Sequence, residues 1–393
     1  MSDRYLPVKL PIILALGTTQ TLAWGSSFYL PAIIAKPVHD DLGLGPSIVF
    51  GAFSLALLIS GLVGPAVGRR IDRHGGRGVL IASNLVLASG LALLGIAGNI
   101  WGLAAAFVLL GLGMGIGLYD AAFATLGRLH GKDARPAITG IALMAGFAST
   151  IAWPLTALGV ETIGWRHTCF GWAAAHILIG LPLNRFGLPL PLSHSVAEGD
   201  ARAELPTVTF DRNMWLLAFA FAAIWFVAGA MAAHMPAVLV ANGVTPAAAI
   251  AASALMGPAQ VAARIFEARF LIRFHPLLSA RLASAGHPLA ALLLVALGPV
   301  AAPLFGMLHG CGNGILTIAR GTVPLAIYGP ANYGYRLGLL GAPARVAQAA
   351  APLAVSLILD LGGAAALVVT GCAGVMTGLA FLAIRPNGNT DAP

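Results

Sequence analysis

The sequence predicts an all-α integral membrane protein whose twelve transmembrane helices form two pseudo-symmetric six-helix bundles. Of its 393 residues, 58% are hydrophobic and only 9% are charged, whereas a soluble domain carries about 25% charged residues. Twelve apolar runs are long enough to cross a bilayer core of about 30 Å, which needs roughly 20 helical residues. The cations also gather at one side of these runs, as the positive-inside rule predicts.

The apolar runs are bounded by charged residues, Pro or Gly. In the first half they span residues 10–34, 48–67, 79–97, 101–126, 137–160 and 168–183. In the second half they span 214–239, 247–270, 279–297, 302–327, 337–359 and 364–384. A polar stretch that contains Glu198, Asp200, Arg202 and Glu204 separates the two sets. We therefore expect an N-terminal bundle over 1–188, a cytoplasmic linker over 189–211 and a C-terminal bundle over 212–393.

The Lys and Arg residues predict the orientation of these spans. With the N-terminus inside, seventeen cations fall on the cytoplasmic side and two, Lys36 and Arg166, fall outside. The first apolar run is too long for a signal-peptide core, so we expect it to remain as a membrane helix. The sequence therefore predicts a multi-pass protein of the cell membrane, expected to be a bacterial inner membrane, with both termini in the cytoplasm.

Several classes of function are disfavoured by composition and motifs. The net charge is +8, but the cations do not cluster as a nucleic-acid surface requires. The three Cys residues are isolated in apolar stretches, which predicts neither a disulfide nor a metal site. No Walker loop, Gly-x-Ser-x-Gly or His-Glu-x-x-His motif occurs, so an enzyme or an ATP-driven pump is disfavoured. We expect no cofactor and a monomer in membrane lipid. We also expect a small-molecule substrate, transported either with protons or without them.

The two halves carry similar glycine patterns. The run 101–126 contains Gly113, Gly115 and Gly117 before Asp120, and the run 302–327 contains Gly310, Gly312 and Gly314 before Arg320. Glycines at this spacing remove side chains where helices cross or where a cavity needs room. Repeated halves are also how many transporters build a site near the bilayer midplane. Plain close packing is the alternative explanation.

The segment Gly64-Pro65-Ala66-Val67-Gly68-Arg69-Arg70-Ile71-Asp72-Arg73-His74-Gly75-Gly76-Arg77 follows the second apolar run. It resembles the G-x-x-x-D-R-x-G-R-R loop of the major facilitator superfamily, and the resemblance extends over nearly the whole chain. It implies the major facilitator fold. Asp72 and Arg73 are expected to pair with charges or helix ends of the opposite bundle and so to latch one conformation.

Within that superfamily, Trp24-Gly25 and Phe28-Tyr29-Leu30-Pro31 look like the monocarboxylate transporter and oxalate:formate exchanger branch. The resemblance implies that Arg264 and Arg345 receive substrate carboxylates. Two departures make the usual proton-coupling pair incomplete: Gln260 stands where that branch has an acid, and Ala32 where it has a Lys.

Charges within apolar runs are costly and are expected to face a cavity or one another. Arg264 can hold a carboxylate through two parallel hydrogen bonds, or pair with Glu267 three residues later on the same helix face. Glu267 is nearer the cytoplasmic end, which favours a gate or an anchor. Arg345 is a second candidate substrate cation, the alternative being contact with helix carbonyls.

Asp120 and Arg320 occupy similar depths in the two halves. Three interpretations remain open for them: a gate across the bundles, a proton carried by Asp120, or a packing pair. His234 and His309 are candidates for proton transfer or for packing. Asn313, one turn beyond His309, makes that helix face polar. Gln20 and Tyr29 belong to a polar and aromatic stripe on the first helix that either lines a cavity or packs.

Two functions follow. The first is secondary transport of a small organic anion by alternating access, coupled to protons or to exchange, with Arg264 and Arg345 as substrate cations. The alternative is proton-driven efflux of a neutral or cationic toxic solute, a drug or a metalloid, through Asp120. The Gly-Pro motif typical of drug and proton antiporters is absent from the fifth run. This absence disfavours the efflux function. A membrane enzyme or channel comes third.

Overall fold

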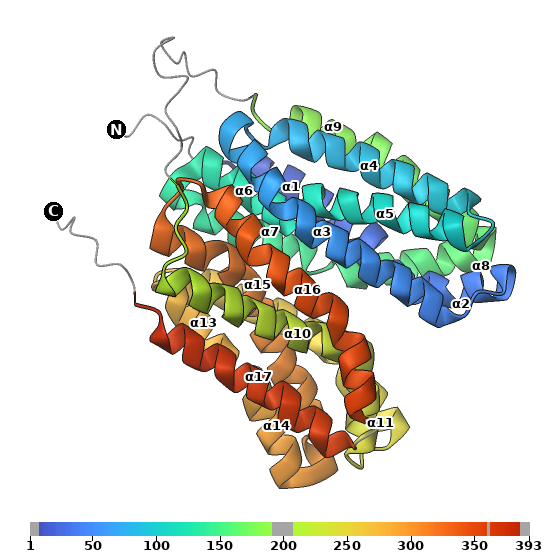
Figure 1. Ribbon diagram of the computed structural model, residues 1–393, viewed down its shortest axis with the longest axis vertical. Coiled ribbons are helices and arrows are strands. Elements are labelled where there is room, and N and C mark those ends of the chain that lie inside the picture. The colour runs from blue at the N-terminus through green and yellow to red at the C-terminus, as the bar shows by residue number, and fades with distance from the viewer. Residues whose placement is uncertain (1–7, 191–206, 360–361, 386–393) are drawn as a thin grey trace. The chain divides into compact units, whose positions relative to one another are not determined.

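The computed structural model describes residues 8–190, 207–359 and 362–385. Nearly all of these residues are helical (Figure 1). Contacts between Cα atoms divide the chain into two compact units. Unit 1 is Met1–Val208 with Pro330–Ala342, and unit 2 is Thr209–Gly329 with Pro343–Pro393. Most of the expected linker lies outside the described residues.

Unit 1 contains nine α-helices, three short helical segments and the start of a tenth α-helix in its described residues. They are α1 (Leu10–Ala23), η2 (Trp24–Phe28), α2 (Pro31–Leu42), α3 (Pro46–His74), α4 (Arg77–Ile96), α5 (Ile100–Gly117), α6 (Tyr119–His130), η3 (Gly131–Ala134), α7 (Arg135–Ala145), α8 (Ala148–Ala175), η4 (His176–Gly180), α9 (Leu181–Phe186) and the start of α16 (Tyr333–Leu359). Helices α3, α4, α5 and α8 run side by side, α4 packing on α5 and α8 (Figure 1).

Several breaks interrupt helices of unit 1 that the apolar runs predict as continuous. The expected helix 101–126 divides into α5 and α6, because Leu118 adopts an extended conformation with ψ of −168°. Within α8, Gly164 has a φ of +82° and produces a kink. Segments η2 and η4 are π-helical. A π-helical turn inside an α-helix is rare and is frequent at functional sites.

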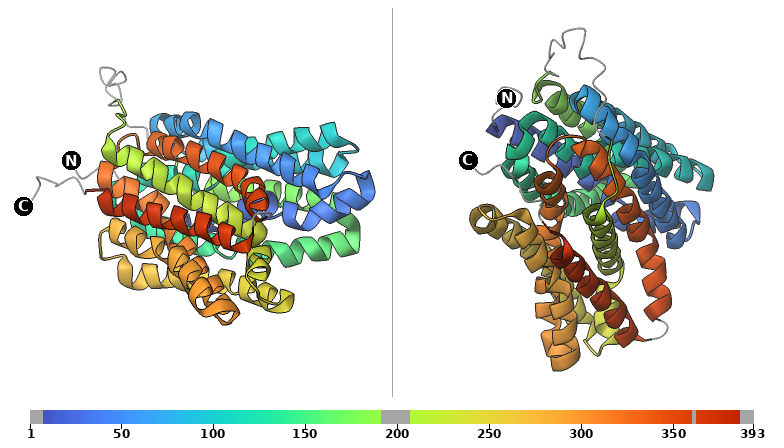
Figure 2. Two further views of the ribbon diagram at one scale, coloured as in Figure 1. Left: turned by 60° about the horizontal axis from the view of Figure 1, so that its bottom comes forward. Right: turned by 60° about the vertical axis from the view of Figure 1, so that its left-hand side comes forward.

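Unit 2 contains the remaining helices. They are α10 (Arg212–Ala241), α11 (Pro246–Ala254), α12 (Met256–Phe266), the π-helical η5 (Glu267–Leu271), α13 (Pro276–Ser284), α14 (Gly286–Leu297), the 3₁₀ segment η6 (Gly298–Ala301), α15 (Ala302–Tyr328), the rest of α16 and α17 (Gly363–Ala383). Helix α15 contacts α10 to α14, whereas α10 and α17 lie next to each other (Figure 2).

The glycines of α15 allow backbone contact with its neighbours. A Cβ atom at Gly306, Gly310 or Gly314 would lie 2.0 to 2.6 Å from a backbone oxygen of α11 or α12. A Cβ at Gly312 would lie 2.7 Å from the Ala283 oxygen of α13. In unit 1, a Cβ at Gly113 would lie 2.6 Å from the Leu87 side chain of α4, and a Cβ at Gly115 would lie 2.2 Å from the Val63 side chain of α3. These glycines therefore allow the helices to pack closely.

The surface of the helices is strongly apolar. Leu62, Leu178 and Val300 are each more than 70% exposed, which in water would be costly but in lipid is not. Among the described residues, eight helical stretches are long and apolar enough to cross a membrane, the longest being Ile100–Phe186 with 87 residues and Pro276–Tyr328 with 53. Each of these two exceeds the roughly 20 residues of one crossing. The chain is therefore a multi-pass membrane protein, while the count of twelve spans stays a prediction.

Candidate functional site

Positive charge is concentrated in the interior of unit 2. Four charged side chains of its described residues are less than a tenth exposed: Arg264 (4%), Glu267 (0%), Arg320 (3%) and Arg345 (5%). Three are guanidinium groups, which stay protonated in proteins, and one is a carboxyl group. Even with Glu267 ionised, this interior carries an excess of two positive charges.

Each of these arginines is oriented by its surroundings. Arg264 lies on α12 and its Nε donates to the Gly314 carbonyl of α15, at 3.3 Å. Arg345 lies on α16 and donates from Nη1 to Gln348 Oε1, one turn later, at 2.9 Å. The guanidinium carbon of Arg320 lies 5.4 Å from the centre of the Trp225 ring, a cation–π geometry. Glu267 begins η5, one turn after Arg264.

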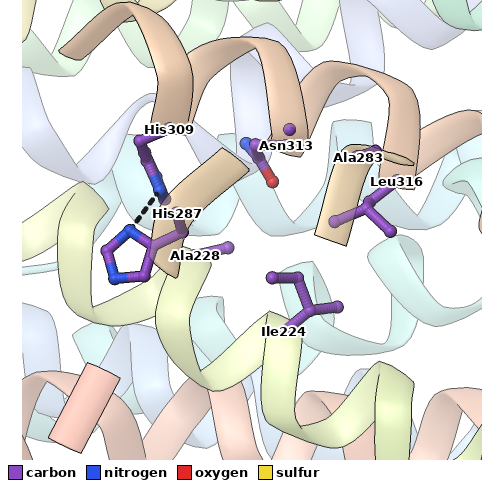
Figure 3. Close-up of a pocket in the computed structure, with 8 residues that line it drawn as sticks. Ile224, Ala228, Ala283, His287, His309, Asn313 and Leu316 are labelled. Atoms are coloured by element: carbon purple, nitrogen blue, oxygen red, sulfur yellow. Dashed lines mark hydrogen bonds between the residues drawn. The ribbon is translucent and has the colours of Figure 1, made fainter. Parts of the chain in front are cut away.

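A pocket in unit 2 contains two of the expected polar residues, His309 and Asn313. It lies between α10, α13, α14 and α15 and has no room for a water-sized sphere, so side chains would have to move to admit a ligand. His309 Nδ1 lies 3.0 Å from His287 Nδ1 (Figure 3). One ring must donate and the other accept. His234 lies elsewhere in unit 2, where its Nε2 donates to the Pro352 carbonyl at 2.8 Å.

In unit 1, the expected loop motif contacts the beginning of α16. Asp72 is 7% exposed and accepts hydrogen bonds from the backbone N–H groups of Gly334 (2.9 Å) and Tyr335 (2.8 Å). A carboxylate at the N-terminus of a helix is favoured by unpaired N–H groups and by the helix dipole. Asp72 therefore binds a helix end, one of the two kinds of partner expected for it.

The neighbouring arginines reinforce this contact. Arg69 donates to the Tyr335 hydroxyl and lies over its ring, 4.0 Å from the centroid. Arg128, from α6, donates to the carbonyls of Asp72 and Arg73 and so caps the C-terminal end of α3. Arg73 takes part through its carbonyl, while its side chain is exposed.

Asp120 lies in the first turn of α6 and lines a second pocket. This pocket, with about 10 Å³ open to a water-sized sphere, lies between α3, α5, α6 and the start of α16, and its other walls include Gly64, Gly68 and Gly338. The pairing of Asp120 with Arg320 remains a prediction, since the two residues belong to different units.

The stripe expected on the first helix is largely packed within unit 1. Gln20 is 1% exposed and donates to the Gly117 carbonyl at the end of α5, at 2.6 Å. The Tyr29 ring meets the Trp153 ring edge-on at 5.7 Å, and Trp153 Nε1 donates to the Tyr29 carbonyl. Gln20 therefore binds the end of α5, and Tyr29 packs against α8.

Two buried histidines of the expected spans, His176 and His287, escaped the sequence analysis. His287 pairs with His309 as described, and His176, at the start of η4, is completely buried. Nε2 of His176 lies 2.8 Å from Ser26 Oγ, and its Nδ1 lies 2.9 Å from Asn84 Oδ1. Both histidines fall within expected spans, so a search of every span for histidines would have found them, although not their partners.

The described residues form two units of apolar helices with charged side chains buried inside them, an arrangement typical of membrane transporters. The sequence matches the description Major Facilitator Superfamily over residues 16–307. The chain belongs to the major facilitator superfamily, and it is a secondary transporter rather than an enzyme. Comparison with curated proteins finds no match.

Solved structures of this superfamily resemble the whole chain. One is the human organic anion transporter MFSD10 (TETRAN), with a TM-score of 0.73, 14% identity, and 94% of this chain and 98% of that chain covered. Another is the proton:xylose symporter XylE bound to 6-bromo-6-deoxy-D-glucose, with a TM-score of 0.69, 14% identity and 94% of each chain covered. At this identity the likeness defines the fold, and members of the superfamily bind small molecules, often with protons.

Proposed function

We propose that this transporter moves a small organic anion, a mono- or dicarboxylate, by alternating access with proton coupling or exchange. One observation carries the proposal: the charged side chains buried among the described residues of unit 2 are three arginines and one carboxyl group. We further propose a bacterial inner membrane location with both termini in the cytoplasm, and membership of the monocarboxylate and oxalate:formate branch, on the motifs of the first helix.

Electrostatics explain why such an interior favours an anion. An arginine at the centre of a membrane helix costs about 2.5 to 3.5 kcal/mol on insertion scales. A carboxylate lowers that cost because it accepts two parallel hydrogen bonds from one guanidinium group. The substrate and the arginines would then stabilise each other, so a closed state would be favoured when the site is loaded.

Labelled carboxylates and purified protein in liposomes test the proposal. We expect Arg264→Gln to reduce the initial rate of lactate or oxalate uptake at least about tenfold, since a hydrogen bond to a charged group contributes about 1.5 to 3 kcal/mol. Arg345→Gln should act in the same direction. Arg273→Gln is the matched control, because that side chain is exposed. Uptake that is insensitive to both buried substitutions, with the variants eluting as the parent protein does, would refute the anion role.

The alternative, proton-driven efflux of a toxic neutral or cationic solute, has one observation in its favour: Asp120 lines a pocket of unit 1. A carboxyl group in such a place can exchange a proton during transport. In this case Asp120→Asn should abolish efflux of a fluorescent cation from liposomes, while Arg264→Gln should leave it intact. Efflux with this pattern, and no carboxylate uptake, would select the alternative.

A further inference from the structure

A chain of buried polar groups connects the two π-helical segments of unit 1. It consists of Ser26 on η2, His176 on η4 and Asn84 on α4, which are 0%, 0% and 3% exposed. Polar groups buried this deeply in an apolar bundle are costly unless they are fully hydrogen-bonded. Here the bonds are short, and they connect the three elements directly.

The direction of the bond between His176 and Asn84 is fixed by the amide. Asn84 Nδ2 donates to the Leu80 carbonyl at 2.8 Å, so its Oδ1 is the atom that faces the ring. An amide oxygen only accepts hydrogen bonds. His176 Nδ1 must therefore carry a hydrogen and donate it to Asn84.

The other ring nitrogen can be satisfied in two ways. Ser26 Oγ lies 2.8 Å from His176 Nε2 and also 2.8 Å from the Leu22 carbonyl, but a hydroxyl has one hydrogen to donate. With a neutral ring, Ser26 donates to Nε2. With a protonated ring, Nε2–H donates to Ser26 Oγ and the hydroxyl turns to the Leu22 carbonyl. Both states keep every bond of the ring, and only one hydroxyl hydrogen turns between them.

We propose that His176, held between Ser26 and Asn84, is a reversible proton-binding site that couples protonation to η2 and η4 during transport. The proton adds to the Nε2 lone pair and leaves from the same atom, so no other group is consumed. Burial in an apolar bundle makes a charged ring costly unless hydrogen bonds stabilise it. Protonation then strengthens the attraction of the ring for the Ser26 oxygen and for the Asn84 amide.

The surroundings make the site reversible, because both hydrogen-bond partners of His176 are neutral. Segment η4 packs on α1, α4, α8 and α9. The titratable or charged groups on these helices are Arg77, Glu161, Arg166, His167, Cys169 and Arg185. Arg77 and Arg166 are bonded to other groups, Glu161, His167 and Arg185 are exposed, and Cys169 is a buried thiol. A carboxylate partner would instead favour the charged ring.

Gly180 shows that the geometry of this site tolerates little change. A Cβ atom at this position, four residues after His176 on η4, would lie 2.1 Å from Asn84 Oδ1. Gly180→Ala must therefore displace the amide that accepts from the ring. The absence of a side chain at 180 is what allows η4 to bring His176 against α4.

Nuclear magnetic resonance on ¹⁵N-histidine-labelled protein in nanodiscs tests proton binding directly, without a substrate. The His176 signals are those that His176→Gln removes. We expect one protonated and one unprotonated nitrogen at high pH, and conversion to two protonated nitrogens on acidification. Asn84→Asp should move this conversion to higher pH, and Asn84→Leu to lower pH. Thr19→Ala, which removes another buried hydroxyl of α1, should leave it unchanged.

Transport measurements test the coupling, and this part rests on the proposed function. We expect His176→Gln to abolish the stimulation of carboxylate uptake by a pH gradient, while exchange of carboxylate across the membrane continues. A ring that stays neutral wherever the protein is folded, or pH stimulation that survives in His176→Gln, would overturn the site. A ring that titrates as expected in a protein that moves no carboxylate would instead overturn the proposed substrate and leave proton binding intact.

Discussion

At the scale of single residues, Asp72 is the best-defined contact of the superfamily motif. Its carboxylate accepts from two consecutive backbone N–H groups at the start of α16, and this contact lies wholly within unit 1. Charge-assisted bonds of this kind are about twice as strong as neutral ones. The first turn of α16 should therefore open less often than the free end of a helix does.

We expect Asp72→Asn to accelerate hydrogen exchange at the amides of residues 334 and 335 by about tenfold or more, because a hydrogen bond to a charged group contributes about 1.5 to 3 kcal/mol. Mass spectrometry of the peptide that contains these amides measures the change. Asp133→Asn, which removes the same charge from an exposed position on η3, serves as the control. Equal protection in the two variants would show that the carboxylate does not hold the turn.

The sequence identifies candidate residues, but it does not show which of them lie together in a site. Arg264, Glu267, Arg320 and Arg345 interrupt apolar runs and are conspicuous for that reason, and all four are buried. The partners of His176 lie 150 and 92 positions away in the chain. No local pattern carries such separations, so only the folded structure reveals that this histidine is part of a hydrogen-bonded chain.

At the scale of elements, apolar runs predict straight helices well and irregular ones poorly. The run 214–239 corresponds to α10 (Arg212–Ala241), and the run 302–327 to α15 (Ala302–Tyr328). The run 101–126 conceals the break at Leu118, and no run marks η2 or η4. Hydropathy reports whether a segment lies in lipid or in water. The breaks depend instead on which backbone carbonyl accepts from each N–H group, and side-chain hydropathy does not report this.

The glycines of α15 give a prediction at this scale. Gly310→Ala should lower the thermal stability of the solubilised protein by several degrees, because its Cβ would lie 2.5 Å from the backbone oxygen of Met256, which cannot move aside alone. Gly257→Ala is the matched control on α12, where a Cβ meets nothing within 4 Å. The control should be neutral or stabilising by up to about 1 kcal/mol. A Gly310→Ala variant as stable as the control would mean that α12 and α15 are farther apart.

At the scale of the whole molecule, the apolar surface and the family assignment agree on a multi-pass transporter. The cation distribution predicts which ends of the helices face the cytoplasm. This prediction is independent of the substrate. It can be tested with residues that are expected on opposite sides of the membrane.

We expect a cysteine placed at Lys36 to react with a membrane-impermeant maleimide added to intact cells, and a cysteine placed at Lys132 to react only after the cells are opened. Both side chains are exposed. The three native cysteines are replaced first, since Cys372 is itself exposed. Labelling of position 132 in intact cells would reverse the proposed orientation.

The contact of Asp72 also bears on how this protein can vary. The carboxylate accepts from main-chain N–H groups, so it requires no particular side chain in its partner. Most residues of α16 can therefore be substituted without a compensating substitution in α3. Positions 334 and 338 are exceptions. A Cβ at 334 would meet the Asp72 carboxylate at 2.9 Å and the Gly68 oxygen at 2.8 Å, and a Cβ at 338 would meet the Gly64 oxygen at 2.4 Å. Homologues should therefore retain glycine at these two positions while the residues between them diverge.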